Sequence, residues 1–177
     1  LEKPDLSDEK IIACLQDEYG IRVVQIAFLP LGADLNTAVY RVVADNQTPC
    51  FVKLRRGVFD EISVALPKFL SDQGIKQIIP PLPTRTAQLW ANLDAFKLIL
   101  YPFVDGKNAY AVDLTDRHRS DFGRALKRIH TAIVPRALAK HIQAETYSPQ
   151  WREIVKTLLK HAEDDTFADS VAMRLAA

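Results

Sequence analysis

Lys53 and Glu61 form the pair of residues whose types and spacing most clearly point to chemistry. Lys53 ends a run of aromatic and β-branched residues typical of a strand, and Glu61 follows eight residues later, where a helix is expected to begin. A flexible lysine ammonium that a carboxylate orients can bind phosphate, and it does so as a mobile point charge, which a planar guanidinium supplies less well. The pair therefore predicts a phosphate-binding site. The alternative is a solvated lysine beside Arg55 and Arg56, with Glu61 only a favourable first-turn residue.

A short segment imitates two catalytic motifs. Residues 121–123 read Asp-Phe-Gly, the tripeptide that binds magnesium in protein kinases, and residues 118–120 read His-Arg-Ser, in the place of a catalytic loop. In those enzymes a pair of strands separates the two motifs, whereas here they adjoin inside one amphipathic helix with Phe122 on its buried face. We therefore expect Asp121 to bind no metal. The four histidines also lack the spacing of a metal site, and we expect them at the surface or in helix packing.

The elements that must position Lys53 follow from the hydrophobic pattern. A helix is expected from Ser7 as N-cap to Gly20, a second over residues 60–73 although Pro67 should kink or divide it, a third over 115–131, and a fourth over 150–162 after Ser148 and Pro149. Strands are expected near residues 22–30, 38–44, 49–54, 88–92 and 95–101, in one antiparallel sheet. This order predicts an α+β fold.

Composition bounds the kind of protein and its partners. The 177 residues are 48% hydrophobic and 25% charged, as in an ordinary globular protein. The net charge of +1 gives no field for nucleic acid or an anionic membrane, and no stretch resembles a signal or a membrane span. We expect a cytoplasmic protein with a small-molecule partner. Cys14 and Cys50 are expected to be reduced packing residues.

Several stretches together resemble one branch of a known family. The resemblance covers roughly residues 5–160 and identifies the chain as a member of the aminoglycoside phosphotransferase family, in the branch of the spectinomycin phosphotransferases. The stretches that carry it are residues 31–42 (Leu-Gly-Ala-Asp-Leu-Asn-Thr-Ala-Val-Tyr-Arg-Val), 51–57, 69–75, 98–106 (Leu-Ile-Leu-Tyr-Pro-Phe-Val-Asp-Gly) and 122–130. It implies a protein-kinase-like N-lobe, with a five-stranded antiparallel sheet plus helix, at residues 1–105. Residues 106–177 are then the hinge exit and the first helices of a truncated C-lobe.

The resemblance also assigns roles to particular residues. Lys53 matches the lysine that binds the nucleotide phosphates, Glu61 the helix glutamate that orients it, and Gly32 the loop that covers the phosphates. Phe51 lies on the same strand face as Lys53, where its ring either stacks on adenine or packs in the core. The stretch from Tyr101 to Phe103 matches the hinge, whose backbone would read the edge of the base. ATP or GTP is the implied ligand, with Mg²⁺ expected only in the full-length enzyme.

The catalytic loop that the family uses does not occur in the sequence. That loop reads His-x-Asp-x-x-x-x-Asn, in which aspartate accepts the substrate proton and asparagine holds magnesium. The residues two places after the four histidines are Ser120, Ala132, Gln143 and Glu163. We therefore expect no catalytic residue and no metal ligand in this chain, which we interpret as an inactive N-terminal part of an antibiotic kinase, with a small-molecule alcohol or antibiotic as substrate of the full-length enzyme.

Other interpretations remain open at this level. The chain could be a non-catalytic nucleotide-binding or interaction domain, or the N-lobe of a kinase for choline, homoserine or another metabolite, because related kinases share this lobe. Exposed apolar surface is expected on the helices at 115–131 and 150–162, and self-association with it.

Overall fold

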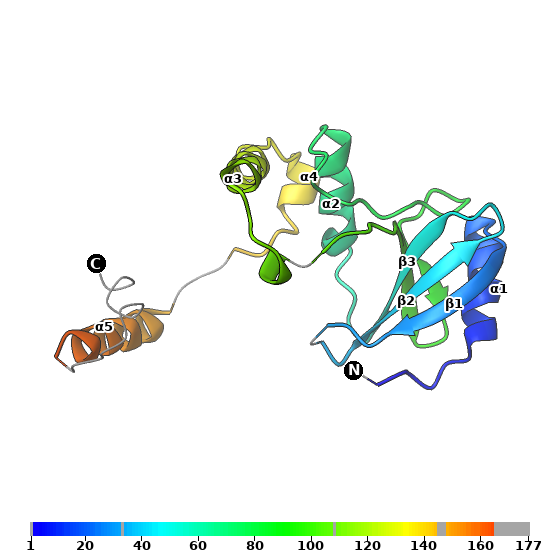
Figure 1. The fold of residues 1–177 in the computed structure, drawn as a ribbon, viewed down its shortest axis with the longest axis horizontal. Helices are drawn as coiled ribbons and strands as arrows, with labels where there is room; N and C mark the ends of the chain where they lie inside the picture. The colour runs from blue at the N-terminus through cyan, green and yellow to red at the C-terminus, as the bar shows by residue number, and fades with distance from the viewer. Residues whose placement is uncertain (1, 33, 108, 145–147, 165–177) are drawn as a thin grey trace. The chain divides into compact units, whose positions relative to one another are not determined.

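The computed structural model describes residues 2–32, 34–107, 109–144 and 148–164 (Figure 1). By contacts between residues the chain divides into two units, residues 1–141 and residues 142–177, and each is described by itself. The first unit holds nearly all of the regular structure. Its elements, in chain order, are α1 (Asp8–Tyr19), β1 (Val23–Leu29), β2 (Thr37–Ala44), β3 (Pro49–Arg56), α2 (Ile62–Asp72), β4 (Ala91–Leu93), β5 (Phe96–Pro102), η1 (Ala109–Ala111), α3 (Asp116–His130) and α4 (Arg136–Ala139).

The five strands form one antiparallel sheet in the order β1-β2-β3-β5-β4, which confirms the predicted α+β fold and its five-stranded antiparallel sheet. Four strands lie within two residues of the predicted bounds. The exception is the strand expected from residue 88, which begins only at Ala91. The preceding residues are held in turns instead, where the Gln88 N–H donates to the Thr84 hydroxyl at 3.0 Å and Ala87 has a positive φ of 62°.

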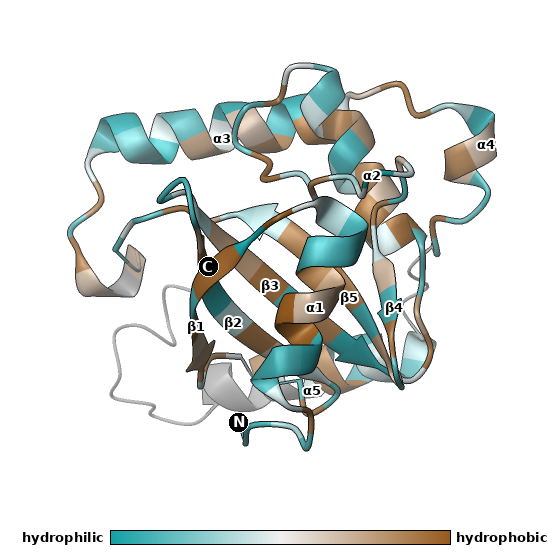
Figure 2. Cartoon of the chain, turned by 90° about the vertical axis from the view of Figure 1, so that its right-hand side faces the viewer, coloured by the Kyte–Doolittle hydropathy of each residue, from teal (hydrophilic) through white to brown (hydrophobic). Residues whose placement is uncertain are grey.

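One face of the sheet is covered by α1 (Figure 2). Strand alternation sends every second residue of β2, β3 and β5 to this face, where Tyr40, Val52 and Leu100 are fully buried. Ser7 stands at the N-cap as predicted, although its side chain makes no capping hydrogen bond, and Gly20 ends the helix in the left-handed region at φ 70°. Both cysteines are free and buried in this core, as expected.

The second helix is continuous through its proline. α2 runs from Ile62 to Asp72 with Pro67 inside it, so the proline does not divide the helix. Val64 and Leu70 are its buried residues, and α4 packs against it. Glu61 occupies the N-cap position, one residue before the helix begins.

α3 is the amphipathic helix predicted over residues 115–131, but its apolar face is only partly covered. Ala125 is buried, and an arginine on the same helix, Arg128, donates to the Gly74 carbonyl at 3.0 Å. Phe122, expected on the buried face, has 66% of its surface exposed, and Leu126 is exposed as well. The spacing of apolar residues fixes which side of a helix is apolar, whereas burial requires a neighbour that covers that side. The expectation of exposed apolar surface on this helix is thereby confirmed.

The second unit contains α5 (Pro149–Asp164). Ser148 and Pro149 begin this helix as predicted, and the Trp151 N–H donates to the Ser148 hydroxyl at 3.4 Å. Trp151 and Val155 are exposed. The side chain of His161, one of the four histidines, lies outside the described residues. Within the described part of the chain, no helix combines the length and the hydropathy that a membrane span requires.

Candidate functional site

Phe51 and Lys53 lie on the face of the sheet opposite α1, because they alternate along β3 with the buried residues of the core. The register aligns the Cα atoms of Phe51 and Tyr101 on neighbouring strands, and those of Lys53 and Ile99. The sequence prediction that Phe51 and Lys53 share a face is therefore correct. Both side chains are half-buried, which leaves them open to a ligand.

A cavity of about 540 Å³ opens beside these residues, and we call it the aromatic cavity. Three of the predicted site residues besides Lys53 contribute rings to its wall: Phe51, Tyr101 and Phe103. The remaining residues that border it are Leu29, Leu31, Ile79, Pro102, Val104 and Gly106. An apolar, ring-lined slot with one ammonium at its edge suits a flat aromatic ligand that carries negative charge.

The rings of this cavity contact one another and an arginine. The Phe51 and Tyr101 rings meet edge to face, with centroids 6.4 Å apart and planes at 62°. The guanidinium carbon of Arg41 lies 5.1 Å from the centre of the Phe103 ring, within the range of a cation–π contact. Burial raises the pKa of the Tyr101 phenol, so this side chain stays neutral well above physiological pH. The walls of the slot are therefore uncharged apart from Lys53.

A second cavity, of about 300 Å³, shares Leu31, Phe51 and Lys53 with the first, and we call it the loop cavity. Its other walls come from the β1–β2 loop, including Gly32 and Asp34, and from the start of β2. Gly32 has a φ of 102°, which a residue with a Cβ would adopt only with strain. The shared ammonium of Lys53 therefore stands at the junction between an apolar slot and a space covered by a loop.

Asp34 shapes the loop over this second cavity. Its carboxylate accepts a hydrogen bond from the Asn36 N–H at 2.9 Å. Its backbone carbonyl accepts one from the Thr37 hydroxyl at 2.9 Å. These bonds close a tight turn and leave a negative charge on the same cavity wall as Lys53.

The backbone at the end of β5 has hydrogen-bonding groups that β3 does not use. The Phe103 N–H donates to the Pro49 carbonyl at 3.4 Å, which makes Phe103 and Pro49 a bonded pair of the antiparallel ladder. Bonded and non-bonded pairs alternate along such a ladder, so the carbonyl of Pro102 points away from β3. Proline has no N–H, and the segment therefore presents an acceptor at Pro102 followed by the main chain of Val104.

Glu61 is the predicted site residue that the structure does not bring to the two cavities. It borders a different cavity, of about 390 Å³, together with Leu138 and His141 near α4. Among the described residues, no carboxylate forms an ion pair with Lys53 within 4.0 Å. The role of Glu61 as the partner of Lys53 thus stays a prediction, without support from its position here.

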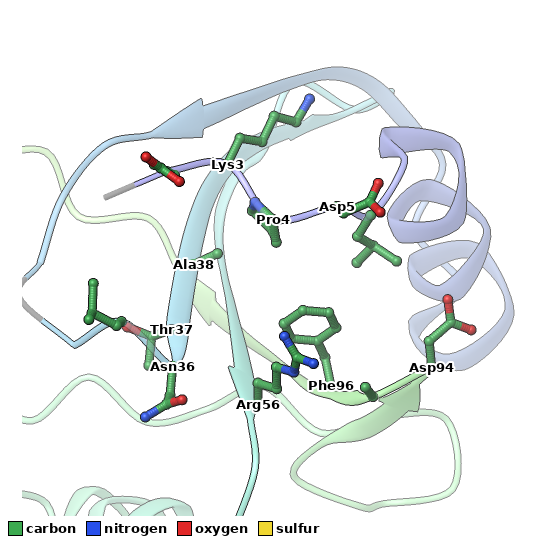
Figure 3. A pocket seen from close by; sticks show the side chains of 13 residues that line it. Lys3, Pro4, Asp5, Asn36, Thr37, Ala38, Arg56, Asp94 and Phe96 are labelled. Carbon is green, nitrogen blue, oxygen red and sulfur yellow. The ribbon is translucent and has the colours of Figure 1, made fainter.

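Another cavity, of about 600 Å³, lies between the N-terminal segment and the ends of β3 and β4, and none of the predicted site residues borders it. Figure 3 shows the N-terminal segment with Lys3 and Asp5 on one side, and Arg56 beside Phe96 on the other. Of its five charged residues, three are acidic: Glu2, Asp5 and Asp94. This lining suits a polyphosphate less well than the cavities around Lys53.

The motif at residues 118–123 has a structural role in the helix. The His118 ring nitrogen Nδ1 accepts from the Thr115 N–H at 3.3 Å, and the Thr115 hydroxyl accepts from the His118 N–H at 3.3 Å. This capping box begins α3. The Asp121 carboxylate pairs with Arg124 and, at 3.8 Å, with Arg117. In the described part of the chain, no three His, Cys, Asp or Glu side chains gather as metal ligands.

Sequence reasoning missed several residues of the two cavities. Leu29 and Val39 could have been found, because antiparallel pairing aligns Val39 with Lys53, and Leu29 with Val39, on the same face of the sheet. Ile79 comes from an extended segment without periodicity, so no local signal marks it. Asp34 belongs to the loop that was predicted, but only the structure shows that its negative charge borders the same cavity as Lys53.

Comparison with known proteins gave matches among solved structures only. No family model matches the sequence, and no curated protein matches it. The chain is similar to the spectinomycin phosphotransferase APH(9)-Ia crystallised with ADP and spectinomycin, at 33% identity and a TM-score of 0.77 over 98% of its length. It is similar also to the AMP-bound complex of that enzyme, at 31% identity and a TM-score of 0.72 over 97% of its length.

A more distant structure supports the fold. The amicoumacin kinase hAmiN, in complex with AMP-PNP, Ca²⁺ and Ami, matches 90% of the chain at 14% identity and a TM-score of 0.54. In each of the three structures, the chain spans only about half of the length, 52%. The similarity therefore extends over nearly the whole of this chain and over part of each neighbour.

Proposed function

We propose that this chain, which belongs to the spectinomycin phosphotransferase family over the part that it spans, binds the nucleotide for a kinase acting on a small hydroxylated antibiotic. The observation that carries the proposal is the junction at Lys53 between the aromatic cavity and the loop cavity. A nucleotide has the same division, with a flat base at one end and phosphates at the other. The base would lie among Phe51, Tyr101 and Phe103, and the phosphates beneath Gly32 and beside Lys53.

We propose ATP rather than GTP as the nucleotide, from the backbone groups at the end of β5. The Pro102 carbonyl can accept a hydrogen bond from the amino group of adenine, and the Val104 N–H, two residues on, can donate to the neighbouring ring nitrogen. Guanine presents an acceptor oxygen and a ring N–H in these places, so its donors and acceptors are reversed. The carbonyl would then face an oxygen, which costs binding free energy because neither group is satisfied.

The acceptor proposed is an alcohol of an antibiotic such as spectinomycin, on the basis of the 33% identity to an enzyme crystallised with that compound. For the 177-residue chain by itself, we propose binding without transfer, because its sequence contains no His-x-Asp-x-x-x-x-Asn loop. Positioning and neutralising the phosphates supply most of the rate in phosphoryl transfer, and both depend on that loop.

The test is calorimetric titration of adenosine, AMP, ATP and guanosine into the chain and two variants. Phe51→Ala should weaken adenosine and ATP alike, by roughly twofold to twelvefold, the range for an aromatic contact of about 0.5–1.5 kcal/mol. Phe59→Ala is the matched control, because its ring packs on Trp90 at 5.1 Å and borders neither cavity. Guanosine binding as tight as adenosine, or equal losses in the two variants, would contradict the proposal.

A further inference from the structure

Arg41 stands outside the aromatic cavity but against one of its walls. Its Cα is aligned with that of Phe51 in the register of β2 and β3, so its side chain lies on the open face of the sheet. Its guanidinium carbon is 5.1 Å from the centre of the Phe103 ring. Phe103 borders the cavity, whereas Arg41 is not among the residues that border it. Arg41 therefore contacts a wall of the cavity, the Phe103 ring, without bordering the cavity itself.

The Phe103 side chain is only weakly restrained by its own strand, because it lies just beyond the end of β5. This residue follows Pro102, the last residue of β5, and its N–H reaches the Pro49 carbonyl at 3.4 Å, a long hydrogen bond. Its side chain is half-buried, unlike Leu98 and Leu100, which are fixed in the core. A ring at such a position keeps rotamer freedom that a ligand would have to remove on binding.

We propose that Arg41 is a positioning residue that holds the Phe103 ring as a preformed wall for the nucleobase. The inference rests on the proposed nucleotide site and adds to it a residue that touches neither base nor phosphate. The cation holds the ring through its quadrupole, so the rotamer cost is met before the ligand arrives.

The expected effect distinguishes Arg41 from a phosphate-binding cation. Because Arg41 acts through the ring beside the base, its loss should weaken adenosine, AMP and ATP by the same factor. That factor is roughly twofold to fivefold, from the ~0.5–1 kcal/mol of an exposed cation–π contact. A cation that bound phosphate would instead leave adenosine unaffected and weaken ATP most.

A double-mutant cycle tests the coupling. Dissociation constants for adenosine and ATP would be measured for the unmodified chain, Arg41→Met, Phe103→Leu and the double variant. We expect Arg41→Met to weaken both ligands equally, Arg41→Lys to recover most of the loss, and Arg41→Met to have no further effect in the Phe103→Leu background. Arg22→Met is the control, because Arg22 faces Asp45 at 3.9 Å. Additive losses, or a loss confined to ATP, would overturn the proposal.

A second measurement does not depend on a ligand. The side-chain protons of Arg41 should show an upfield ring-current shift by NMR in the free chain, and Phe103→Leu should abolish it. If the shift is absent while adenosine still binds, the proposal that Arg41 positions the Phe103 ring is overturned, and the proposed nucleotide site stands. If the unmodified chain binds no adenosine, the proposed function fails and the role of Arg41 in base binding fails with it.

Discussion

The two faces of the sheet are built from alternate residues of the same strands, and they differ in what their residues contact. On the face covered by α1, Val52 and Leu54 of β3 are fully buried among apolar neighbours. On the opposite face, Phe51 and Lys53 of the same strand are half-buried and border two cavities. The difference shows that a shift of one residue along β3 separates a side chain that stabilises the fold from one that is available to a ligand.

The largest effect is expected on the covered face. Leu100→Ala removes a side chain that is fully buried, and should lower the free energy of unfolding by about 2–5 kcal/mol through lost burial and a cavity. Urea denaturation monitored by circular dichroism would measure it. The control is Lys53→Met on the open face, for which we expect a change below ~0.5 kcal/mol. Equal destabilisation by the two variants would break the comparison.

The next effect concerns the open face and binding. Lys53→Met removes the ammonium that the two cavities share and should cost roughly 1–3 kcal/mol of ATP binding, the range for a charge-assisted contact. Adenosine, which has no phosphate, should bind as before. Calorimetry with both ligands measures the split. A parallel loss of adenosine affinity would mean that Lys53 supports the base and not the phosphates.

The free energy of unfolding should depend on pH through Cys14, which is buried on the face of the sheet covered by α1. Burial, with smaller effects from the Glu18 and Asp17 charges, raises the pKa of the Cys14 thiol from 9.0 to about 11. Between pH 9 and 11 the folded state therefore keeps a proton that the unfolded state loses. The thiol's contribution to the free energy of unfolding, on the order of 2 kcal/mol, is present below pH 9 and is lost as the pH rises toward 11. Denaturation across this range for the chain and for Cys14→Ala checks it. The same slope in both would contradict a role for this thiol.

A smaller effect is expected within the open face. Asp34→Asn keeps the oxygen that accepts from the Asn36 N–H but removes the negative charge beside Lys53. Affinity for ATP without metal should rise by about twofold to fivefold, the range for exposed charges, and this gain should shrink at high salt. Adenosine serves as the control ligand. A fall in ATP affinity would show that the carboxylate supports binding.

The smallest effect is expected away from both faces, on α3. Asp121→Ala removes a carboxylate that pairs with Arg124 and Arg117, so nucleotide affinity should stay unchanged within error. Calorimetry beside a spectinomycin phosphorylation assay tests this. Turnover by the chain that Asp121→Ala abolishes would make the tripeptide at residues 121–123 a catalytic centre, and would contradict its interpretation as part of a capped helix.

Most of the fold could be predicted from local sequence, but only some of the residues that border the two cavities could be. Alternation and turn residues located the strands, and the positions of Phe51 and Lys53 on one face follow from their spacing alone. The position of Glu61 relative to Lys53 could not be predicted in the same way, because the orientation of a helix relative to a sheet depends on long-range packing. Phe122 shows the same limit, since its apolar neighbours on the helix predicted a buried face that the described residues leave exposed.

The sequence by itself determined the antiparallel sheet, the glycine that ends α1 and the place of Lys53 on its strand. These features depend on residues that are close together in the chain, so their spacing is enough to predict them. Only the tertiary structure decided that Asp34 faces the cavity of Lys53, that Glu61 borders another, and that Arg41 lies over Phe103. Arg41 and Phe103 are far apart in the chain, and they meet because three antiparallel strands align them, which is a property of the register and not of either segment.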